Sequence, residues 1–311
     1  VQVLRAIDSK DDKAKQKILR AQMLANRVID AVDMCLTASK SQVAFVSGTV
    51  ERCSLEIAPL NVGPSMDAGV WSKRLAILAS AAMPSRIGLD PESVDIIDVG
   101  SPFDYENTAM LYCAKHLPEP NDPSRDNSVH DEIERLINFA GGRTLALFTT
   151  YRAMHLAADE MEKRLMFNIF RQDQLPKMAL INAFSDDEQS CLFATAGFFQ
   201  GVDVPGRALS LVIIDKIPFP RPDDPLLSAR RDVVGKNWFN EIDIPLAATA
   251  LAQASGRLIR SQNDSGVVAI LDPRLATKGY GKRLGSVLPP MKRTIEIKEV
   301  QSFLQQIINA E

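Results

Sequence analysis

Four short segments of this chain are apolar along their whole length, and helical patterns lie between them. A strand that is apolar throughout is buried on both faces, unlike the half-exposed strands of many antiparallel sheets. Buried strands that alternate with helices are typical of a parallel sheet covered on both sides. The sequence therefore predicts an α/β fold with a doubly wound, mainly parallel sheet. The expected strands are 144–150, 191–197, 209–215 and 266–272, with a further one at 96–100, and the expected helices are 127–140, 151–165, 225–240, 245–261 and 298–309.

The first part of the chain has a different pattern. Apolar residues recur at helical spacing from Lys13 to Thr37. Strand-like segments follow at 42–50, 54–60 and 75–80 before prolines and glycines interrupt the pattern.

Composition and charge limit the classes of protein to which this chain could belong. A hydrophobic content of 46% in 311 residues is enough for a sizeable core. No apolar run approaches the roughly 18 residues that span a bilayer, so we expect a cytoplasmic protein without a membrane partner. The net charge of -3 argues against general electrostatic capture of nucleic acid, so any such contact must be local. The four cysteines lack the short paired spacing of metal sites and are expected to be buried thiols.

The expected helix over 246–261 has one polar face. Gln253, Gly256, Arg257 and Arg260 stand at i, i+3, i+4 and i+7, and about 100° per residue places them on the same side. The other side carries residues for the core: Leu251, Leu258 and Ile259. Two guanidinium groups one turn apart suit a phosphate. The alternative is an ordinary solvated surface.

Hydroxyl groups lie near the ends of two of the expected strands. Thr149 and Thr150 precede a helix, where hydroxyl and free N–H groups suit a nucleic-acid phosphate, although a helix cap would also explain them. Thr195 ends another strand and could donate to a phosphate.

The glycine-rich loop after Thr195 is a second candidate for ligand contact. Asp203 could accept a hydrogen bond from a nucleotide hydroxyl or an arginine, and the alternative is an ordinary turn capped by an aspartate. Phe198 or Phe199 could stack on a base or pack in the core.

Four segments together resemble the helicases of the DinG and XPD type in superfamily 2. QASGRLIR (253–260) resembles motif VI, and FATAGFFQGVDVPGRALSLVIIDKIPFPRPDDP (193–225) resembles motif V. LALFTTYRAM (145–154) resembles motif IV, and LAILASAAM (75–83) resembles motif III. The chain departs from the family at Ala82, where a threonine is usual, while Ser80 keeps a hydroxyl.

The resemblance implies a division of the chain and a role for each motif. Residues 86–311 would form the second RecA-like motor domain, and residues 1–85 a remnant of the arch insertion and of the first motor domain. Arg257 and Arg260, with Gln253, would act on the ATP γ-phosphate. The other implied residues are Gly201, Asp203 and Gly256 for the nucleotide, Thr149, Thr150 and Thr195 for single-stranded DNA, and Ser80 for coupling.

Two motifs of such motors are missing from the sequence. There is no G-x-x-x-x-G-K-[ST] loop to hold phosphates, and no DEAH-type box follows an apolar strand, since His130-Asp131-Glu132 is expected within a helix. By the resemblance, the chain would be a fragment that shares ATP with a first motor domain on its N-terminal side. The Mg²⁺ ligands would lie there, as would the family's iron–sulfur cluster where present, and the fragment alone would be inactive.

Two other functions remain open on the sequence. Ala82 favours a non-catalytic nucleic-acid-binding module from a degenerate helicase. The third hypothesis is an unrelated enzyme with a doubly wound fold that acts on a phosphorylated small molecule. The missing G-x-G-x-x-G fingerprint and the scarcity of histidine, with three residues, count against it.

Overall fold

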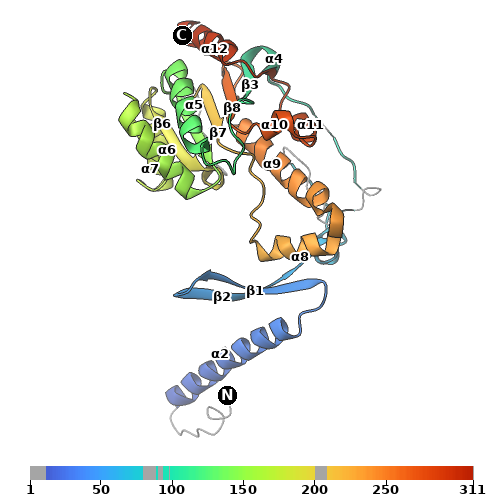
Figure 1. Cartoon of the computed structure of the whole chain (residues 1–311). Coiled ribbons are helices and arrows are strands. Elements are labelled where there is room, and N and C mark those ends of the chain that lie inside the picture. Colours follow the sequence, from blue (N-terminus) through green and yellow to red (C-terminus); the bar gives the residue numbers. More distant parts are fainter. Residues whose placement is uncertain (1–11, 80–88, 90–93, 98, 200–208, 311) are drawn as a thin grey trace. The chain divides into compact units, whose positions relative to one another are not determined.

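The chain folds into two compact units. The computed structural model describes residues 12–79, 89, 94–97, 99–199 and 209–310 (Figure 1). One unit comprises residues 1–96 with 221–238, and the other comprises residues 97–220 with 239–311. The predicted domain boundary after residue 85 falls outside the described residues and stays a prediction. No helix in the described part of the chain is long and apolar enough to cross a membrane.

A seven-stranded sheet forms the centre of the larger unit. Its strand order is β5-β6-β4-β7-β8-β3-β9, and every neighbouring pair is parallel. The strands are β3 (Ala109–Cys113), β4 (Thr144–Phe148), β5 (Ile169–Arg171), β6 (Cys191–Thr195), β7 (Leu211–Ile214), β8 (Gly266–Ile270) and β9 (Lys292–Thr294). The non-sequential order requires helical crossovers, which confirms the predicted doubly wound α/β fold.

Helices cover both faces of this sheet, because successive side chains of each strand point to opposite sides. Leu145 and Leu147 belong to one buried cluster, and Ala146 and Phe148 to the other. The first cluster includes side chains of α7 (Lys177–Asp186), α9 (Ile244–Ser255) and α11 (Gly281–Ser286). The second includes side chains of α5 (Arg125–Ala140), α6 (Tyr151–Arg164) and α12 (Ile297–Ala310). The larger unit also contains the short helices α4 (Tyr105–Thr108) and α10 (Arg274–Thr277), a 3₁₀-helix (Ala196–Phe199) and a π-helix (Phe239–Asp243).

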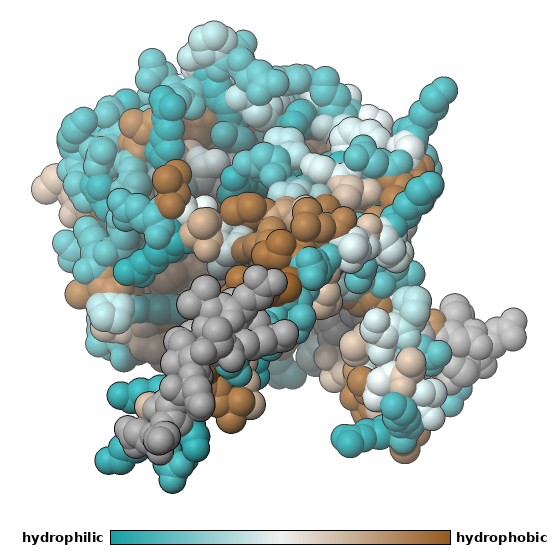
Figure 2. All heavy atoms as spheres, turned by 90° about the horizontal axis from the view of Figure 1, so that it is seen from below, coloured by the Kyte–Doolittle hydropathy of each residue, from teal (hydrophilic) through white to brown (hydrophobic). Residues whose placement is uncertain are grey.

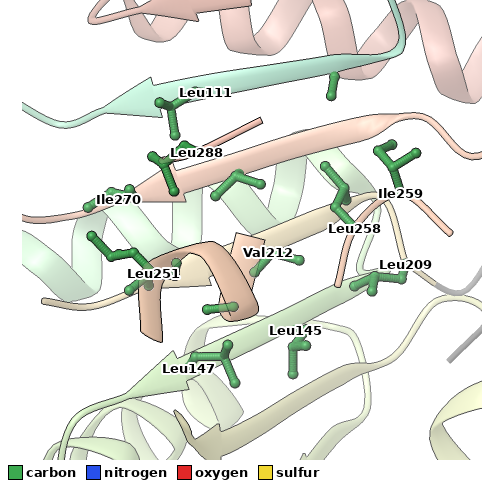
Figure 3. Close-up of a cluster of buried hydrophobic side chains, with 14 of the residues drawn as sticks. Leu111, Leu145, Leu147, Leu209, Val212, Leu251, Leu258, Ile259, Ile270 and Leu288 are labelled. Atoms are coloured by element: carbon green, nitrogen blue, oxygen red, sulfur yellow. The ribbon is translucent and has the colours of Figure 1, made fainter. Parts of the chain in front are cut away.

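The first cluster packs α9 and the turn after it onto the sheet. Figure 3 shows Leu251 of α9 close to the strands that carry Leu147 and Ile270. Leu258 and Ile259 lie farther along, near Leu209, at the ends of the strands opposite the arrowheads. The cluster therefore reaches from the body of α9 to the amino edge of the sheet.

The smaller unit has little core of its own. Helix α2 (Asp12–Leu36) has no buried residue, and β1 (Gln42–Thr49) and β2 (Arg52–Pro59) form an antiparallel hairpin. Short helix α3 (Gly63–Met66) and one turn of π-helix (Asp67–Trp71) follow. Helix α8 (Pro225–Val234) packs against β1. Arg230 Nε on α8 donates to the carbonyl oxygen of Leu60, just after β2, at 2.8 Å. Large apolar side chains of this unit therefore reach the surface, among them Leu24 and Val28 on α2. Figure 2 views the whole molecule and shows hydrophobic atoms exposed near the middle of the face in view.

Two expected strands are wrong. The described residues of 75–80 and of 96–100 have no regular structure, and Leu75, Ile77, Ile97 and Val99 are exposed. A strand needs a neighbour to accept and donate its backbone hydrogen bonds, and no described strand pairs with either segment. The sheet instead contains β3, β5 and β9, which the sequence did not predict.

The expectation of four buried thiols is wrong in part. Cys113 and Cys191 are buried on strands, and burial raises their thiol pKa values to about 11 and about 12. Cys35 is only half-buried and Cys53 is exposed, because α2 and β2 bury no complete face.

Truncation of a core side chain on α9 tests this packing. Leu251 is fully buried, so Leu251→Ala should lower the free energy of unfolding by about 2–5 kcal/mol through lost contacts and a cavity. Leu246 on the same helix is 43% exposed, and Leu246→Ala is the matched control with a much smaller expected effect. Urea unfolding followed by circular dichroism measures both, and equal losses would show that α9 does not pack as described.

Candidate nucleotide and nucleic-acid sites

The predicted arginine pair does not lie on a helix. Helix α9 ends at Ser255, and the backbone N–H groups of Arg257 and Leu258 donate to Ala254 and Ser255, three residues back, at 3.3 Å each. This tightened turn replaces the last helical turn that the sequence predicts. The expectation of one helical face carrying Gln253, Arg257 and Arg260 is therefore wrong, and only Gln253 remains on the helix, where it is exposed.

The turn is held by two apolar side chains rather than by helical hydrogen bonds. Leu258 and Ile259 are almost completely buried in the first cluster, at the amino edge of the sheet (Figure 3). Arg257 and Arg260 flank this buried pair and are themselves only half-buried. The sequence expectation that Leu251, Leu258 and Ile259 face the core is confirmed.

Gly256 allows the tight approach of the chain at this turn. Its φ of -66° is open to any residue, so no left-handed conformation requires the glycine. A Cβ atom there would lie 3.1 Å from the carbonyl oxygen of Ala252, closer than ordinary contacts. The glycine thus fits by its small size.

Partial burial affects the pKa of both arginines. Loss of solvent around Arg257 and Arg260 lowers the pKa of each guanidinium, and the carboxylate of Asp264 works in the opposite direction at Arg260. Because an arginine starts from a pKa above about 12, both remain cations at neutral pH. A partly desolvated cation interacts more strongly with an anion than one in free solvent.

The predicted threonines lie at the other edge of the sheet. Phe148 pairs with Thr195 in the ladder of β4 and β6, so Thr149 and Thr150 follow at the same carboxyl edge. Thr150 caps α6, because its Oγ1 accepts from the backbone N–H of Ala153 at 3.2 Å. This confirms the capping alternative for Thr150, and the hydroxyl of Thr149 has no hydrogen-bond partner within the described residues.

A glutamine that the sequence did not single out joins the two strand ends. Gln172 Oε1 accepts from the backbone N–H and the hydroxyl of Thr195 at 2.7 and 2.8 Å, and its Nε2 donates to the hydroxyl of Tyr151 at 2.6 Å. Tyr151 is an exposed first-turn residue of α6 and stacks on His155. The only signal in the sequence is a polar residue in the connection between the expected helix 151–165 and the expected strand 191–197, which is too common to be informative.

Buried charge holds Thr149 in place. Asp215, at the end of β7, accepts from the backbone N–H of Thr149 at 3.0 Å. Arg125 is also buried and donates to the carbonyl oxygens of Asp215 and Leu271 at 2.7 and 2.9 Å. Burial raises the pKa of the Asp215 carboxyl to about 6, although Lys216, the Thr149 N–H and Arg125 favour its charged form.

A small pocket opens beside these residues. It lies between the first turns of α5 and α6, and its lining includes three cationic side chains, those of Arg125, Arg152 and Lys216, together with Thr150 and Asp215. The carboxyl edge thus combines a helix N-terminus, hydroxyls and cations, which are the groups that hold phosphates.

Some of the other predicted residues lie outside the part of the chain that the structure describes. Gly201, Asp203 and Ser80 lie outside the described residues, as does Ala82. Phe198 is half-buried against the first cluster, with Lys177 Nζ 5.4 Å from its ring centroid, which agrees with the core alternative. Among the described residues, no three His, Cys, Asp or Glu side chains gather as metal ligands would.

The fold and its two edges define an α/β domain of the RecA-like kind, with candidate phosphate-binding groups at both edges of the sheet. The helicase C-terminal domain family matches residues 133–291, which is about half of the chain and includes Arg257 and Arg260 as well as the three threonines Thr149, Thr150 and Thr195. The chain therefore belongs to this family and carries the helicase C-terminal domain of the DinG and XPD type.

Two relatives found by sequence agree with this assignment. The ATP-dependent helicase DinG of Mycobacterium tuberculosis is 42% identical over 274 residues, which cover 84% of this chain and 41% of the relative. The ATP-dependent DNA helicase YoaA of Escherichia coli is 37% identical over 223 residues, covering 71% and 35%. The chain thus spans about two fifths of the length of such relatives. A solved XPD helicase structure aligns with a TM-score of 0.48 and 21% identity over 60% of this chain and 35% of that one.

The raised pKa of Asp215 predicts how stability depends on pH. An unfolded aspartate has a pKa of about 3.9, so the folded state binds the proton of Asp215 more tightly than the unfolded state does. The resulting stabilisation of the folded state is complete below a pH of about 4 and is lost as the pH rises through about 6. Asp215→Asn keeps an oxygen for the Thr149 N–H and does not titrate. The free energy of unfolding of Asp215→Asn, relative to that of wild type, should therefore be higher at pH 7 than at pH 4 by at most about 3 kcal/mol.

Urea unfolding at both pH values measures this difference, with Asp186→Asn on exposed α7 surface as the control. Parallel pH profiles for wild type and Asp215→Asn would show that the carboxyl is not desolvated in the folded chain.

Proposed function

We propose that this chain is the second motor domain of an ATP-dependent DNA helicase, and that it contributes arginine side chains to ATP held mainly by another domain. The supporting observation is the turn after α9, which fixes Arg257 and Arg260 on either side of a buried Leu258–Ile259 anchor.

The chemistry explains why arginines are suited to this position. Transfer of the γ-phosphoryl group to water spreads negative charge over the phosphoryl oxygens, and guanidinium groups that are already in place stabilise that charge. Arg257 and Arg260 would contact those oxygens, and Gln253 would lie beside them at the end of α9. Gly201 and Asp203 remain proposed nucleotide contacts by their motif, with Gly256 allowing the close turn.

The carboxyl edge is the proposed path for single-stranded DNA. The first turn of α6 presents backbone N–H groups, and Thr149 and Thr195 supply hydroxyls at the carboxyl ends of β4 and β6. Arg152 and Lys216 line the pocket at the same edge. Phosphates of any sequence would fit such a set, and the exposed ring of Tyr151 could support a base. The Thr195 hydroxyl already donates to Gln172, so a phosphate there would have to compete with that bond.

The second candidate function is a nucleic-acid-binding module without ATP turnover. Ala82 favours it, because Ala82 removes the hydroxyl that the motif III resemblance leads us to expect, and Ser80 would then be the remaining coupling residue. The two functions share the carboxyl edge and differ at the arginines. DNA-stimulated ATP turnover by the full-length protein separates them.

Replacement of the arginines tests the leading proposal. Arg257→Ala and Arg260→Ala in the full-length protein should each lower DNA-stimulated ATP turnover by about 100-fold or more, because each removes charge stabilisation from the transition state. Arg283→Ala is the matched control, since Arg283 is an exposed arginine on α11 that bonds Asn240. Turnover that survives in both arginine variants would rule out this role.

A subtler change tests the DNA path. Thr149→Val keeps the shape of the side chain and removes a hydroxyl that has no partner among the described residues. The dissociation constant for single-stranded DNA should rise about three- to tenfold, as expected for one hydrogen bond, with DNA-independent ATP turnover unchanged. Thr150→Ser preserves the helix cap and should bind as wild type. Fluorescence anisotropy measures both, and an unchanged constant for Thr149→Val would contradict the path.

A further inference from the structure

Arg260 lies in a loop without regular structure, so another group must fix its backbone. The nearest candidate is Asp264, four residues later. Its Oδ2 accepts from the backbone N–H groups of Arg260 and Ser261, each at 2.8 Å, and its Oδ1 accepts from the Ser261 hydroxyl at 2.9 Å. One carboxylate thus closes the loop that begins at Arg260.

The hydrogen bonds to the Asp264 carboxylate are charge-assisted and therefore stronger than those to a neutral acceptor. A charged acceptor makes shorter and stronger hydrogen bonds than a neutral one, and two backbone N–H groups that converge on one oxygen restrict both peptide units. Without the carboxylate, both N–H groups would lose their acceptor, and the loop could adopt other conformations.

The loop is fixed on both sides of Asp264. Upstream, Leu258 and Ile259 are buried in the core. Downstream, Gly266 begins β8 against the backbone of Ser210, where a Cβ atom would come within 2.3 Å of the Ser210 carbonyl oxygen. Asp264 holds the segment between these two anchors.

The two arginines are also connected to each other. Arg260 Nε donates to the carbonyl oxygen of Arg257 at 3.2 Å. A shift of the backbone at Arg260 would therefore disturb the bond to Arg257 as well. The position of the pair depends on the loop that Asp264 closes.

We propose that Asp264 is a positioning residue that holds Arg260 in place for ATP turnover. The inference rests on the proposed function, since it acts through an arginine that would contact the γ-phosphate. Asp264 itself touches neither nucleotide nor DNA in this account. Its effect should appear in the rate of the chemical step and not in the binding of ATP.

The test is a double-mutant cycle in the full-length protein with saturating DNA. Asp264→Ala should lower kcat about 10- to 100-fold, as misplacement of a catalytic group does, with KM for ATP nearly unchanged. In an Arg260→Ala background, the same change should lower kcat by no more than about twofold, because the group it positions is already gone. Asp264→Asn keeps one acceptor oxygen and should restore part of the rate.

Each result has a distinct meaning. If Arg260→Ala leaves kcat unchanged, the proposed function fails before the inference is tested. If Arg260→Ala lowers kcat but Asp264→Ala leaves it unchanged, or lowers it by the same factor in both backgrounds, the positioning role is overturned. Should Asp264→Ala fail to fold, the cycle is run with Asp264→Asn, whose effect must also vanish without Arg260.

A matched control separates positioning from general loss of a turn. Asp187 also accepts a backbone N–H in a turn of the larger unit, from Gln189 at 3.2 Å, and bonds Asn168 Nδ2 at 2.7 Å. Asp187→Ala should leave kcat unchanged. A loss as large as that of Asp264→Ala would show that the effect is one of stability and would overturn the inference.

Discussion

Burial of both faces of the parallel sheet is the constraint on which the larger unit depends. Each strand supplies side chains to two cores, so the described strands leave little room for polar chemistry along their length. Functional groups are therefore confined to the ends of the strands. The proposed DNA path lies at the carboxyl edge, and the arginines proposed to contact ATP lie at the amino edge, with the whole sheet between them.

The same constraint explains what could be predicted from the sequence. Continuous apolar runs such as 144–148 and 266–270 identify central strands, and helical spacing identifies α5, α6 and α12. The short strands β5 and β9 have only three residues each and carry no distinct pattern. The apolar segments 75–80 and 96–100 were misassigned because a strand depends on a neighbour, which a local pattern does not contain.

The candidate sites were predictable as residue types and not as geometry. The arginines and threonines follow from their motifs, but the helix that should present the arginines stops at Ser255 because a tightened turn leads Leu258 into the core. The partners of these residues come from distant parts of the sequence: Asp215 binds Thr149, and Gln172 binds Thr195. Asp264 is close in sequence to Arg260, yet an aspartate in a polar loop is too ordinary to be recognised without its hydrogen bonds.

The central claim is that Arg257 and Arg260 recognise the γ-phosphoryl group during its transfer. The most direct measurement compares the affinity of the full-length protein for ADP with its affinity for ADP plus aluminium fluoride, which mimics the transferring group. In the double variant Arg257→Ala/Arg260→Ala, we predict that affinity for the fluoride complex falls by about 100-fold or more while affinity for ADP alone is unchanged. Equal affinities of wild type and variant for the fluoride complex would contradict the claim.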